Sequence, residues 1–471
     1  MKNKASFDVI VIGTGSAGFS AIEAAVEQGA SVCAIEQEKL GGECPNFACV
    51  PSKALLKAAS VYRTVQHARD FGITVGAVSH DFSKLMQYRG SVVDSITGGG
   101  EYGERYKAIF SKLGVEVKYG KARFIDDHMI EVNGENIFGN TIVIATGTVD
   151  FIPPIKDIEQ IPYKNWKEVI LQKRQPKSMA IIGGGPVGCE LATFYATFGT
   201  RVVLLQRASQ VLHREDEEIA LLAFHSLVDI GIDVRLNVEV DSVIDSRGGV
   251  FGVRIRNQSG LEMIAVDQVV LAAGKKANIE GLDVDQAGVM LDHSGYVKTT
   301  KDQRTSVHHI FAAGDVDGGL QFTHTAHHEG SVAGYNAALI AKKKRTSLKT
   351  TNERVVPRVT FIPSEVASVG MTQEQAKKEY KQVLVGRWPI SNLGRAVTEN
   401  QRFGLLKIIA HPKTRKVIGG HVIGERAGEV IHEIALAMFL NTTIDKLSEM
   451  IHAFPTYSEA IAGAAASVVK E

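Results

Sequence analysis

The first two thirds of the chain alternate short apolar runs with glycine turns. Residues 7–12 and 31–36 are apolar runs typical of buried strands, and they flank a glycine turn at 13–18 and a helical pattern at 19–28. A strand, a tight turn, a helix and a second strand in this order make one βαβ unit. The same order recurs across 178–205, so the pattern predicts an α/β fold with two Rossmann-like dinucleotide-binding units.

Other apolar runs also end in glycine. The runs at 141–147, 268–274 and 309–315 each predict a buried strand that delivers a glycine to the edge of a sheet, where doubly wound folds bind ligands. Beyond about residue 352 the glycine turns stop, and short strands mix with helices. This change predicts a separate α+β domain in the last part of the chain.

Length, charge and hydrophobicity limit the kinds of partner that the chain can have. The chain has 471 residues, enough for about three domains, and a net charge of +1 with a pI of about 7.7. This balance argues against nucleic acid or a membrane surface as a partner, and no apolar run is long enough to span a bilayer. We expect a cytoplasmic protein with small-molecule ligands and without a resident metal.

The first glycine turn has the pattern of a dinucleotide site. Gly13, Gly15 and Gly18 permit a tight turn and a close approach of the backbone to a pyrophosphate at a helix N-terminus. Glu36, at the end of the second strand, lies where an acid can bind a ribose hydroxyl.

The second glycine turn predicts a second dinucleotide, at Gly183, Gly185 and Gly188. Its second strand ends in Gln206 and Arg207, so an amide replaces the acid that would bind the ribose of NAD. The guanidinium can bind the 2′-phosphate of NADP. NADPH is therefore favoured as the cofactor, with NADH as the alternative.

Cys44 and Cys49 lie just behind the first turn, in Gly-Gly-Glu-Cys-Pro-Asn-Phe-Ala-Cys-Val-Pro-Ser-Lys, and this placement indicates a redox site beside a dinucleotide. Five residues of regular helix separate Cα atoms by about 7.5 Å, whereas a disulfide needs roughly 4.4–6.8 Å. If the pair bridges, the backbone must bend. We expect a helix that begins near Pro45 and is disturbed by Pro51, and we expect the other two cysteines in the core.

Together these motifs resemble the pyridine nucleotide-disulfide oxidoreductases, a flavoprotein family that includes dihydrolipoamide dehydrogenase, glutathione reductase and mercuric reductase. The likeness covers nearly the whole chain and includes Ala-Thr-Gly at 145–147, Gly-Asp at 314–315 and the segment 357–370. It implies a homodimer and FAD as a cofactor. The domains that it implies are an FAD-binding domain at 1–152 and 276–350, an NAD(P)-binding domain at 153–275 and a C-terminal α+β dimerisation domain at 351–471.

The resemblance also implies roles for individual residues. Lys53 and Glu190 would form a buried ion pair beside the flavin. Cys49 would be the thiol against the flavin, and Cys44 would face the substrate. The FAD site would be lined by Gly13, Gly15, Gly18, Glu36, Gly42, Lys53, Ala122, Thr146 and Asp315. The nicotinamide cofactor would be held by Gly183, Gly185, Gly188, Arg207 and Gly274.

The C-terminal segment departs from the family pattern. Thiol reductases of the family carry a His-Pro-Thr-x-x-Glu segment that the other subunit donates, and its histidine relays protons for thiol exchange. Here Pro455, Thr456 and Glu459 match, but Phe454 stands where the histidine should be. His452, two residues earlier, is interpreted as structural. Mercuric reductases also lack that histidine, but they add a C-terminal cysteine pair that is missing here.

The sequence therefore predicts an FAD-dependent NAD(P)H oxidoreductase with a redox-active Cys44–Cys49 disulfide. Its acceptor would not be the usual dithiol but a quinone, a metal ion or an unusual disulfide. One alternative is a dithiol or disulfide reductase that uses His452 or another base, and Glu459 matches the glutamate that orients the histidine in the family segment. An alternative of another class is a redox-sensing protein whose flavin and disulfide switch its contacts without turnover.

Overall fold

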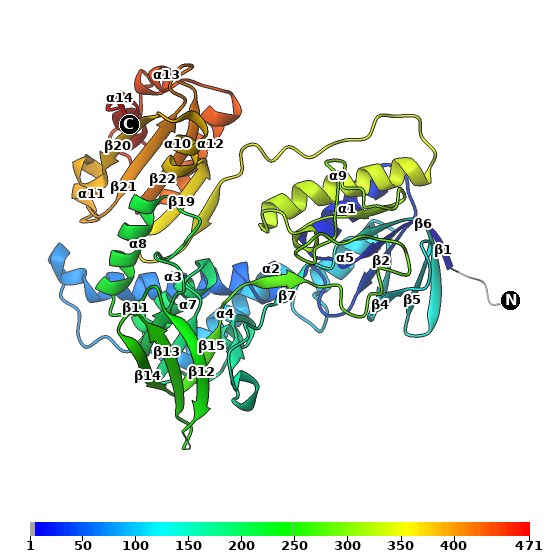
Figure 1. The fold of residues 1–471 in the computed structure, drawn as a ribbon, viewed down its shortest axis with the longest axis horizontal. Coiled ribbons are helices and arrows are strands. Elements are labelled where there is room, and N and C mark those ends of the chain that lie inside the picture. The colour runs from blue at the N-terminus through cyan, green and yellow to red at the C-terminus, as the bar shows by residue number, and fades with distance from the viewer. Residues whose placement is uncertain (1–4, 247) are drawn as a thin grey trace. The chain divides into compact units, whose positions relative to one another are not determined.

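The computed structural model describes residues 5–246 and 248–471, which divide into two compact units. The first unit contains the chain up to Ala54 together with 86–151 and 274–352. The second contains 55–85, 152–273 and 353–471 (Figure 1). Each unit is therefore assembled from stretches of chain that are distant in sequence.

A mainly parallel sheet forms the centre of the first unit. Its strands are β1 (Ala5–Ile12), β2 (Val32–Glu36), β3 (Glu116–Tyr119), β4 (Ala122–Phe124), β5 (Met129–Val132), β6 (Glu135–Ile144) and β17 (Ile310–Ala312). They are ordered β3-β2-β1-β6-β5-β4, with β17 paired to β6. The pairs of β4 with β5 and β5 with β6 are antiparallel, and the other pairs are parallel. A short antiparallel pair, β7 (Thr148–Asp150) with β16 (Lys275–Ala277), stands beside this sheet.

Helices complete the first unit and lead out of it. They are α1 (Ser16–Glu27), α2 (Glu43–Asn46), α3 (Cys49–Gln66), α4 (Phe82–Thr97), α5 (Glu104–Lys112) and α9 (Thr323–Ala341). The unit boundary falls within α3 and within α4. α1 begins at Ser16, earlier than the predicted residue 19, because the end of the glycine turn already has helical dihedral angles. None of the helices in the described part of the chain is long and apolar enough to cross a membrane.

Alternate residues of β1 feed two cores on opposite faces of the sheet. Val9 and Val11 join the core under α1 and α9, which lie side by side in Figure 1. Ile10 and Ile12 join a second core built with residues from 277–316. Side chains of a strand alternate between its faces, so a continuous apolar run such as β1 must be covered on both sides.

The second unit begins with a parallel sheet and a meander. The sheet has the order β11-β10-β9-β15-β8, and the meander the order β12-β13-β14. The bounds are β8 (Lys164–Asn165), β9 (Ser178–Ile182), β10 (Arg201–Leu205), β11 (Asp233–Arg235), β12 (Glu239–Asp245), β13 (Phe251–Asn257), β14 (Gly260–Val266) and β15 (Gln268–Leu271), with helices α6 (Trp166–Leu171), α7 (Pro186–Thr197) and α8 (Glu217–Asp229). The predicted second βαβ unit is thus β9, α7 and β10.

An antiparallel sheet of order β18-β19-β22-β21-β20-β23 completes the second unit. Its strands are β18 (Arg358–Thr360), β19 (Glu365–Gly370), β20 (Leu384–Pro389), β21 (Leu405–Ala410), β22 (Val417–Gly424) and β23 (Val469–Lys470). The accompanying helices are α10 (Gln373–Tyr380), α11 (Gly394–Thr398), α12 (Ala427–Phe439), α13 (Ile444–Ser448) and α14 (Glu459–Ala466). This sheet and its helices share one core, as the predicted α+β domain requires.

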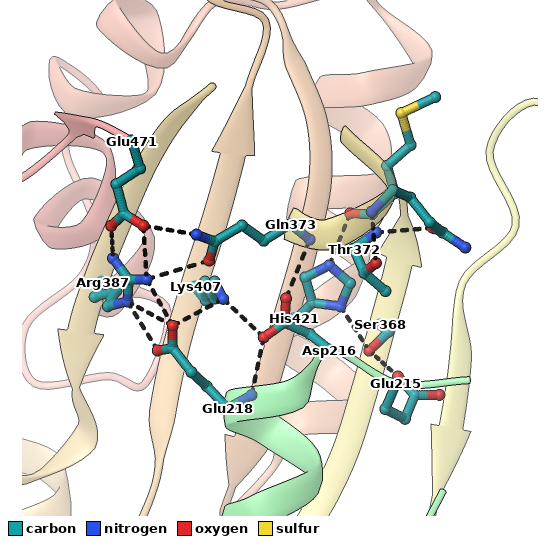
Figure 2. A network of polar contacts seen from close by, with 12 residues as sticks. Glu215, Asp216, Glu218, Ser368, Thr372, Gln373, Arg387, Lys407, His421 and Glu471 are labelled. Atoms are coloured by element: carbon teal, nitrogen blue, oxygen red, sulfur yellow. Dashed lines mark hydrogen bonds and ion pairs between the residues drawn. The ribbon is translucent and has the colours of Figure 1, made fainter. Parts of the chain in front are cut away.

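Buried charges join α8 to this antiparallel sheet within the second unit (Figure 2). Lys407 Nζ on β21 donates to Asp216 Oδ1 at 2.7 Å and to Glu218 Oε1 at 3.0 Å. The side chains of Lys407 and Asp216 are each 2% exposed. Because a buried charge without a partner is costly, this contact fixes the start of α8 against β21.

Arg387 on β20 extends the network to the last residue of the chain. Its guanidinium donates to both carboxylate oxygens of Glu218, at 2.6–3.1 Å, and to the carboxylate of Glu471 (Figure 2). The hydrogen bond from Arg387 lowers the pKa of Glu218 from its ordinary 4.5 to about 2.

In Glu218→Gln the melting temperature should therefore fall less steeply at acid pH than in wild type. The contribution of the charged Glu218 is complete above pH 4.5 and is lost as the pH falls towards about 2. We expect the variant to melt about 1–3 °C below wild type at pH 7, with the gap closing as the pH falls below 4.5. Thermal melts across this range measure it.

Glu374→Gln is the matched control. Glu374 pairs with Lys378 at 2.8 Å, but both side chains are more than three-quarters exposed, and exposed pairs contribute little. A melting difference between Glu218→Gln and wild type that stays constant through the acid range would contradict the assignment.

Candidate functional site

The two cysteines lie on either side of a break between two helices. Cys44 is in α2, Cys49 opens α3, and Phe47 interrupts the helical dihedral angles with φ −134°. The expected helix from Pro45 with a disturbance at Pro51 is wrong. The break comes before Cys49, so Pro51 falls in the first turn of α3, where its missing N–H is not needed.

The break brings the two thiols together. Both side chains are thiols, and the hydrogen bond with Cys49, together with burial, raises the pKa of Cys44. This hydrogen bond places the two sulfur atoms side by side. Cys44 and Cys49 are therefore placed for dithiol chemistry.

Thr323, the first residue of α9, also belongs to this site. Its Oγ1 lies 3.6 Å from Cys49 Sγ, and its hydrogen bond to Cys44 lowers the pKa of that thiol, against the larger effect of Cys49. The positive end of a helix favours a nearby thiolate. Thr323 was not among the predicted site residues; a threonine at the start of an apolar periodic segment was the available signal.

The first glycine turn has the shape that a dinucleotide requires. A Cβ on Gly18 would lie 1.9 Å from Gly13 O, and one on Gly42 would lie 2.5 Å from Gly15 Cα. Glu36 Oε2 accepts hydrogen bonds from Thr14 N at 3.0 Å and Thr14 Oγ1 at 2.7 Å. The buried Glu36 thus holds the turn itself from the end of β2.

Polar atoms around this turn favour a bound group. Among the described residues, Thr146 Oγ1 and Asn46 Oδ1 are buried without a hydrogen-bond partner, which is costly unless a ligand or water satisfies them. Burial raises the pKa of Asp315, and the nearby Lys275 opposes this rise. The residues present therefore fit FAD, with Asp315 able to bind its hydroxyl groups.

An ion pair between Lys275 and Glu43 joins the cysteine segment to β16 within the first unit. Lys275 Nζ donates to Glu43 Oε2 at 2.6 Å, and Glu43 is the first residue of α2. Ala122, a predicted flavin contact, lies on β4 opposite Val132. The Lys275–Glu43 pair could not be predicted from the sequence because the two residues are distant in the chain.

The second glycine turn repeats this geometry in the second unit. A Cβ on Gly188 would lie 1.9 Å from Gly183 O, and Gly185 caps α7. Gln206 Oε1 accepts from Gly184 N at 3.0 Å, the position that Glu36 takes at the first turn. The residue that replaces the ribose-binding acid thus holds the turn instead.

An open cleft adjoins the end of β10. Its volume is about 360 Å³, and it is lined by Arg207, Asn237, Val238, Glu239, Arg256, Asn257 and Gln258. Arg207 is exposed on this cleft, so its guanidinium is free of the core and available to an anionic ligand.

Three predicted residues are divided between the units. Lys53 and Gly274 lie in the first unit, and Glu190 lies in the second. Gly274 is the residue at which the chain enters the first unit again, and its carbonyl oxygen accepts from Phe151 N at 3.0 Å. Glu190 is buried in α7, and its Oε1 accepts from Phe361 N at 3.1 Å.

In the C-terminal segment the side chain of His452 is buried, whereas that of Phe454 is exposed. His452 has a side chain only 5% exposed, with Nε2 2.9 Å from Glu433 Oε1 and Nδ1 3.2 Å from Met450 O. The Phe454 residue is 79% exposed. Glu459 Oε2 accepts from Thr456 N at 2.8 Å, so its carboxylate is oriented within the segment.

A cluster of possible metal ligands lies in the first unit, although no resident metal was expected. Asp127, His128 and His309 bring ligand atoms within 4.8 Å of one another. The two imidazole rings stack with centroids 3.9 Å apart and planes at 7°. Their lone pairs therefore lie in nearly parallel planes and do not converge, and we assign no ion to the cluster.

Comparison with known proteins matches both units. Residues 7–330 match the family "Pyridine nucleotide-disulphide oxidoreductase", and 356–465 match its dimerisation domain. The mercuric reductase of Staphylococcus aureus is 32% identical over 465 residues, which cover 99% of this chain and 83% of that protein. A dihydrolipoyl dehydrogenase of Bacillus subtilis (strain 168) is 32% identical over 465 residues, covering 98% of each.

Solved structures give the same result. The HOCl-induced flavoprotein disulfide reductase RclA from Escherichia coli superposes with a TM-score of 0.83 at 28% identity, covering 98% of this chain and 99% of that one. Its Cu(II) complex superposes with a TM-score of 0.84 at 28% identity and the same coverage.

Gly18→Ala should reduce flavin binding. The added Cβ would lie 1.9 Å from Gly13 O, so the turn must open and its N–H groups would no longer face the pyrophosphate. We expect the flavin content of the purified protein to fall several-fold, as measured by the ratio of flavin to protein absorbance. Gly90→Ala is the control, because a Cβ there meets nothing within 4 Å. Full flavin content in a folded Gly18→Ala protein would refute this assignment.

Proposed function

Because the chain belongs to the pyridine nucleotide-disulphide oxidoreductases, a family of FAD-dependent enzymes that use NAD(P)H, we propose that it is an NADPH-dependent reductase of thiophilic metal ions, with Cu(II) as the test acceptor. The observation that carries the proposal is Phe454, which stands where the thiol reductases of the family have their proton-relaying histidine. Electrons would leave through Cys44 and Cys49.

The cysteine site of this chain supports electron delivery to a metal. Thiolates are soft ligands that favour Cu(I), and the contact between the two sulfur atoms would let them hold one ion together. Thr323 and the N-terminus of α9 favour the thiolate form. A bound FAD would supply the two-electron chemistry between the nicotinamide and the disulfide.

The proton balance distinguishes a metal from a disulfide as acceptor. Reduction of two Cu(II) ions by one NADPH yields two Cu(I) ions, NADP⁺ and one proton, and no proton is delivered to the acceptor. Reduction of a disulfide must protonate the leaving thiolate, and phenylalanine cannot do so. His452 is already engaged by Glu433 and Met450 O, which supports a structural role over that of a base.

Two relatives also support a metal acceptor. RclA, at 28% identity, is described in a complex with Cu(II), and the relative from S. aureus is a mercuric reductase. This chain covers 99% of RclA and 83% of the mercuric reductase, which supports metal ions as the acceptors to test.

We propose a homodimer in which the C-terminal segment completes the cysteine site of the partner. The match to the dimerisation domain supports this assembly. Large apolar side chains are also exposed on this part of the chain, at Leu436, Phe439, Leu440, Met450, Ile451 and Phe454. An apolar Phe454 over the partner's site would also suit a quinone, which is the second candidate acceptor.

The acceptor proposal predicts rapid oxidation of NADPH with Cu(II) and slow oxidation with lipoamide or glutathione disulfide. Phe454→His should raise disulfide reductase kcat/KM by about 10- to 100-fold, because positioned proton transfer contributes 10²–10⁴ in rate and Glu459 is oriented nearby. Stopped-flow or steady-state NADPH oxidation measures both activities.

Two variants control this experiment. Cys44→Ser should lose Cu(II) reduction but keep its bound flavin. This result would distinguish reduction of the metal by the cysteine pair from reduction directly by the flavin. His452→Ala should leave acceptor preference unchanged. Fast lipoamide turnover by wild type that disappears in His452→Ala would overturn the proposal in favour of a dithiol reductase with His452 as base. Slow turnover with every acceptor would favour a redox sensor.

The cofactor proposal predicts a preference for NADPH that depends on Arg207. Arg207→Gln should raise KM for NADPH about tenfold or more, because a charged hydrogen bond to phosphate is lost, and should leave KM for NADH unchanged. Steady-state kinetics with both cofactors test this, with Arg201→Gln as the control at the other end of β10. A wild-type preference for NADH would show that the assignment is wrong.

A further inference from the structure

The loop between β10 and α8 is tied to the second glycine turn. This segment, the 206–216 loop, carries Arg207 near its start. Gln206 donates from Nε2 to Gln210 O at 3.2 Å, and Leu212 N donates to Gly184 O at 2.8 Å. A shift of the loop therefore moves both Arg207 and the backbone of the glycine turn.

The far end of the 206–216 loop is held by the antiparallel sheet of the same unit. Arg358 on β18 donates from Nε to Glu215 Oε1 at 2.6 Å and from a terminal nitrogen to Glu215 Oε2 at 3.1 Å. The same nitrogen donates to Arg214 O at 3.2 Å. Ser368 also donates to the Glu215 carboxylate, and His421 Nδ1 lies 3.0 Å from Ser368 Oγ (Figure 2).

Asp216 closes the loop with a second set of contacts. It accepts from Lys407 Nζ at 2.7 Å and from Gln373 N at 3.1 Å (Figure 2). Glu215 and Asp216 are adjacent, so two consecutive carboxylates bind two cations of the antiparallel sheet. The side chains of Glu215 and Arg358 are 8% and 21% exposed.

From this arrangement we infer that Arg358 is a positioning residue for the nicotinamide cofactor. It acts through Glu215 and the 206–216 loop, which sets the place of Arg207 and of the glycine turn. The inference rests on the proposed function in so far as Arg207 binds the 2′-phosphate. A bidentate guanidinium–carboxylate pair fixes both the distance between the two side chains and their relative orientation. An apolar contact would not fix their orientation.

Arg358→Gln and Glu215→Gln test the inference. Each should raise KM for NADPH about fivefold to tenfold with kcat within about twofold of wild type, and the double variant should be no worse than either single one. Calorimetric titration with 2′,5′-ADP should show the same loss of affinity. Arg358→Lys, which keeps the charge but not the fork, should fall between wild type and Arg358→Gln.

Arg387→Gln is the matched control. Arg387 also crosses from the antiparallel sheet to the region of α8, but it binds Glu218 and Glu471 and not the 206–216 loop. It should lower the melting temperature without raising KM. The inference is overturned if Arg358→Gln lowers the melting temperature with KM unchanged, or if Arg387→Gln raises KM as much as Arg358→Gln.

The same measurements distinguish an error in the role of Arg358 from an error in the assignment of NADPH as the cofactor. If wild type prefers NADH and does not bind 2′,5′-ADP, the proposal for NADPH is wrong. KM for NADH in Arg358→Gln then still reports whether Arg358 positions the glycine turn, because Leu212 joins the loop to Gly184.

Discussion

Close approach of the helix to the strand at the two glycine turns is the constraint on which the structure depends. At each turn a Cβ on the last glycine would lie 1.9 Å from the carbonyl oxygen of the first, so only glycine permits the helix N-terminus to face the edge of the sheet. The next strand then holds the turn, through Glu36 in the first unit and Gln206 in the second. A dinucleotide pyrophosphate fits where these N–H groups point.

Helix ends also position the cysteine pair. The break after α2 brings Cys44 to Cys49 at the start of α3, and the start of α9 adds Thr323. Helix N-termini carry partial positive charge, which favours a thiolate, whereas the hydrogen bond with Cys49 and burial raise the pKa of Cys44. Under the proposed function, Phe454 in place of a histidine would remove a proton relay and leave the cysteine pair unchanged.

In the second unit, buried ion pairs fix the position of the 206–216 loop on the antiparallel sheet. Burying Lys407 with Asp216 costs desolvation that the attraction roughly offsets, so such pairs add little net stability. They do exclude alternative arrangements, since either charge alone would be left buried. The pairs of Lys407 with Asp216 and of Arg358 with Glu215 therefore define where the 206–216 loop meets the antiparallel sheet.

The sequence by itself determined the βαβ units and the placement of Gln206 behind the second glycine turn, because apolar period and glycine position report local backbone conformation. It also places a phenylalanine, and no histidine, at position 454. It placed helix starts only to within a few residues, and it placed the disturbance of the helix at Pro51, whereas the break comes before Cys49. Thr323 beside Cys49, Glu43 with Lys275, and Arg358 with Glu215 appeared only in the tertiary structure. These contacts join residues more than a hundred positions apart, and no local pattern of polarity encodes which distant charge a side chain will meet.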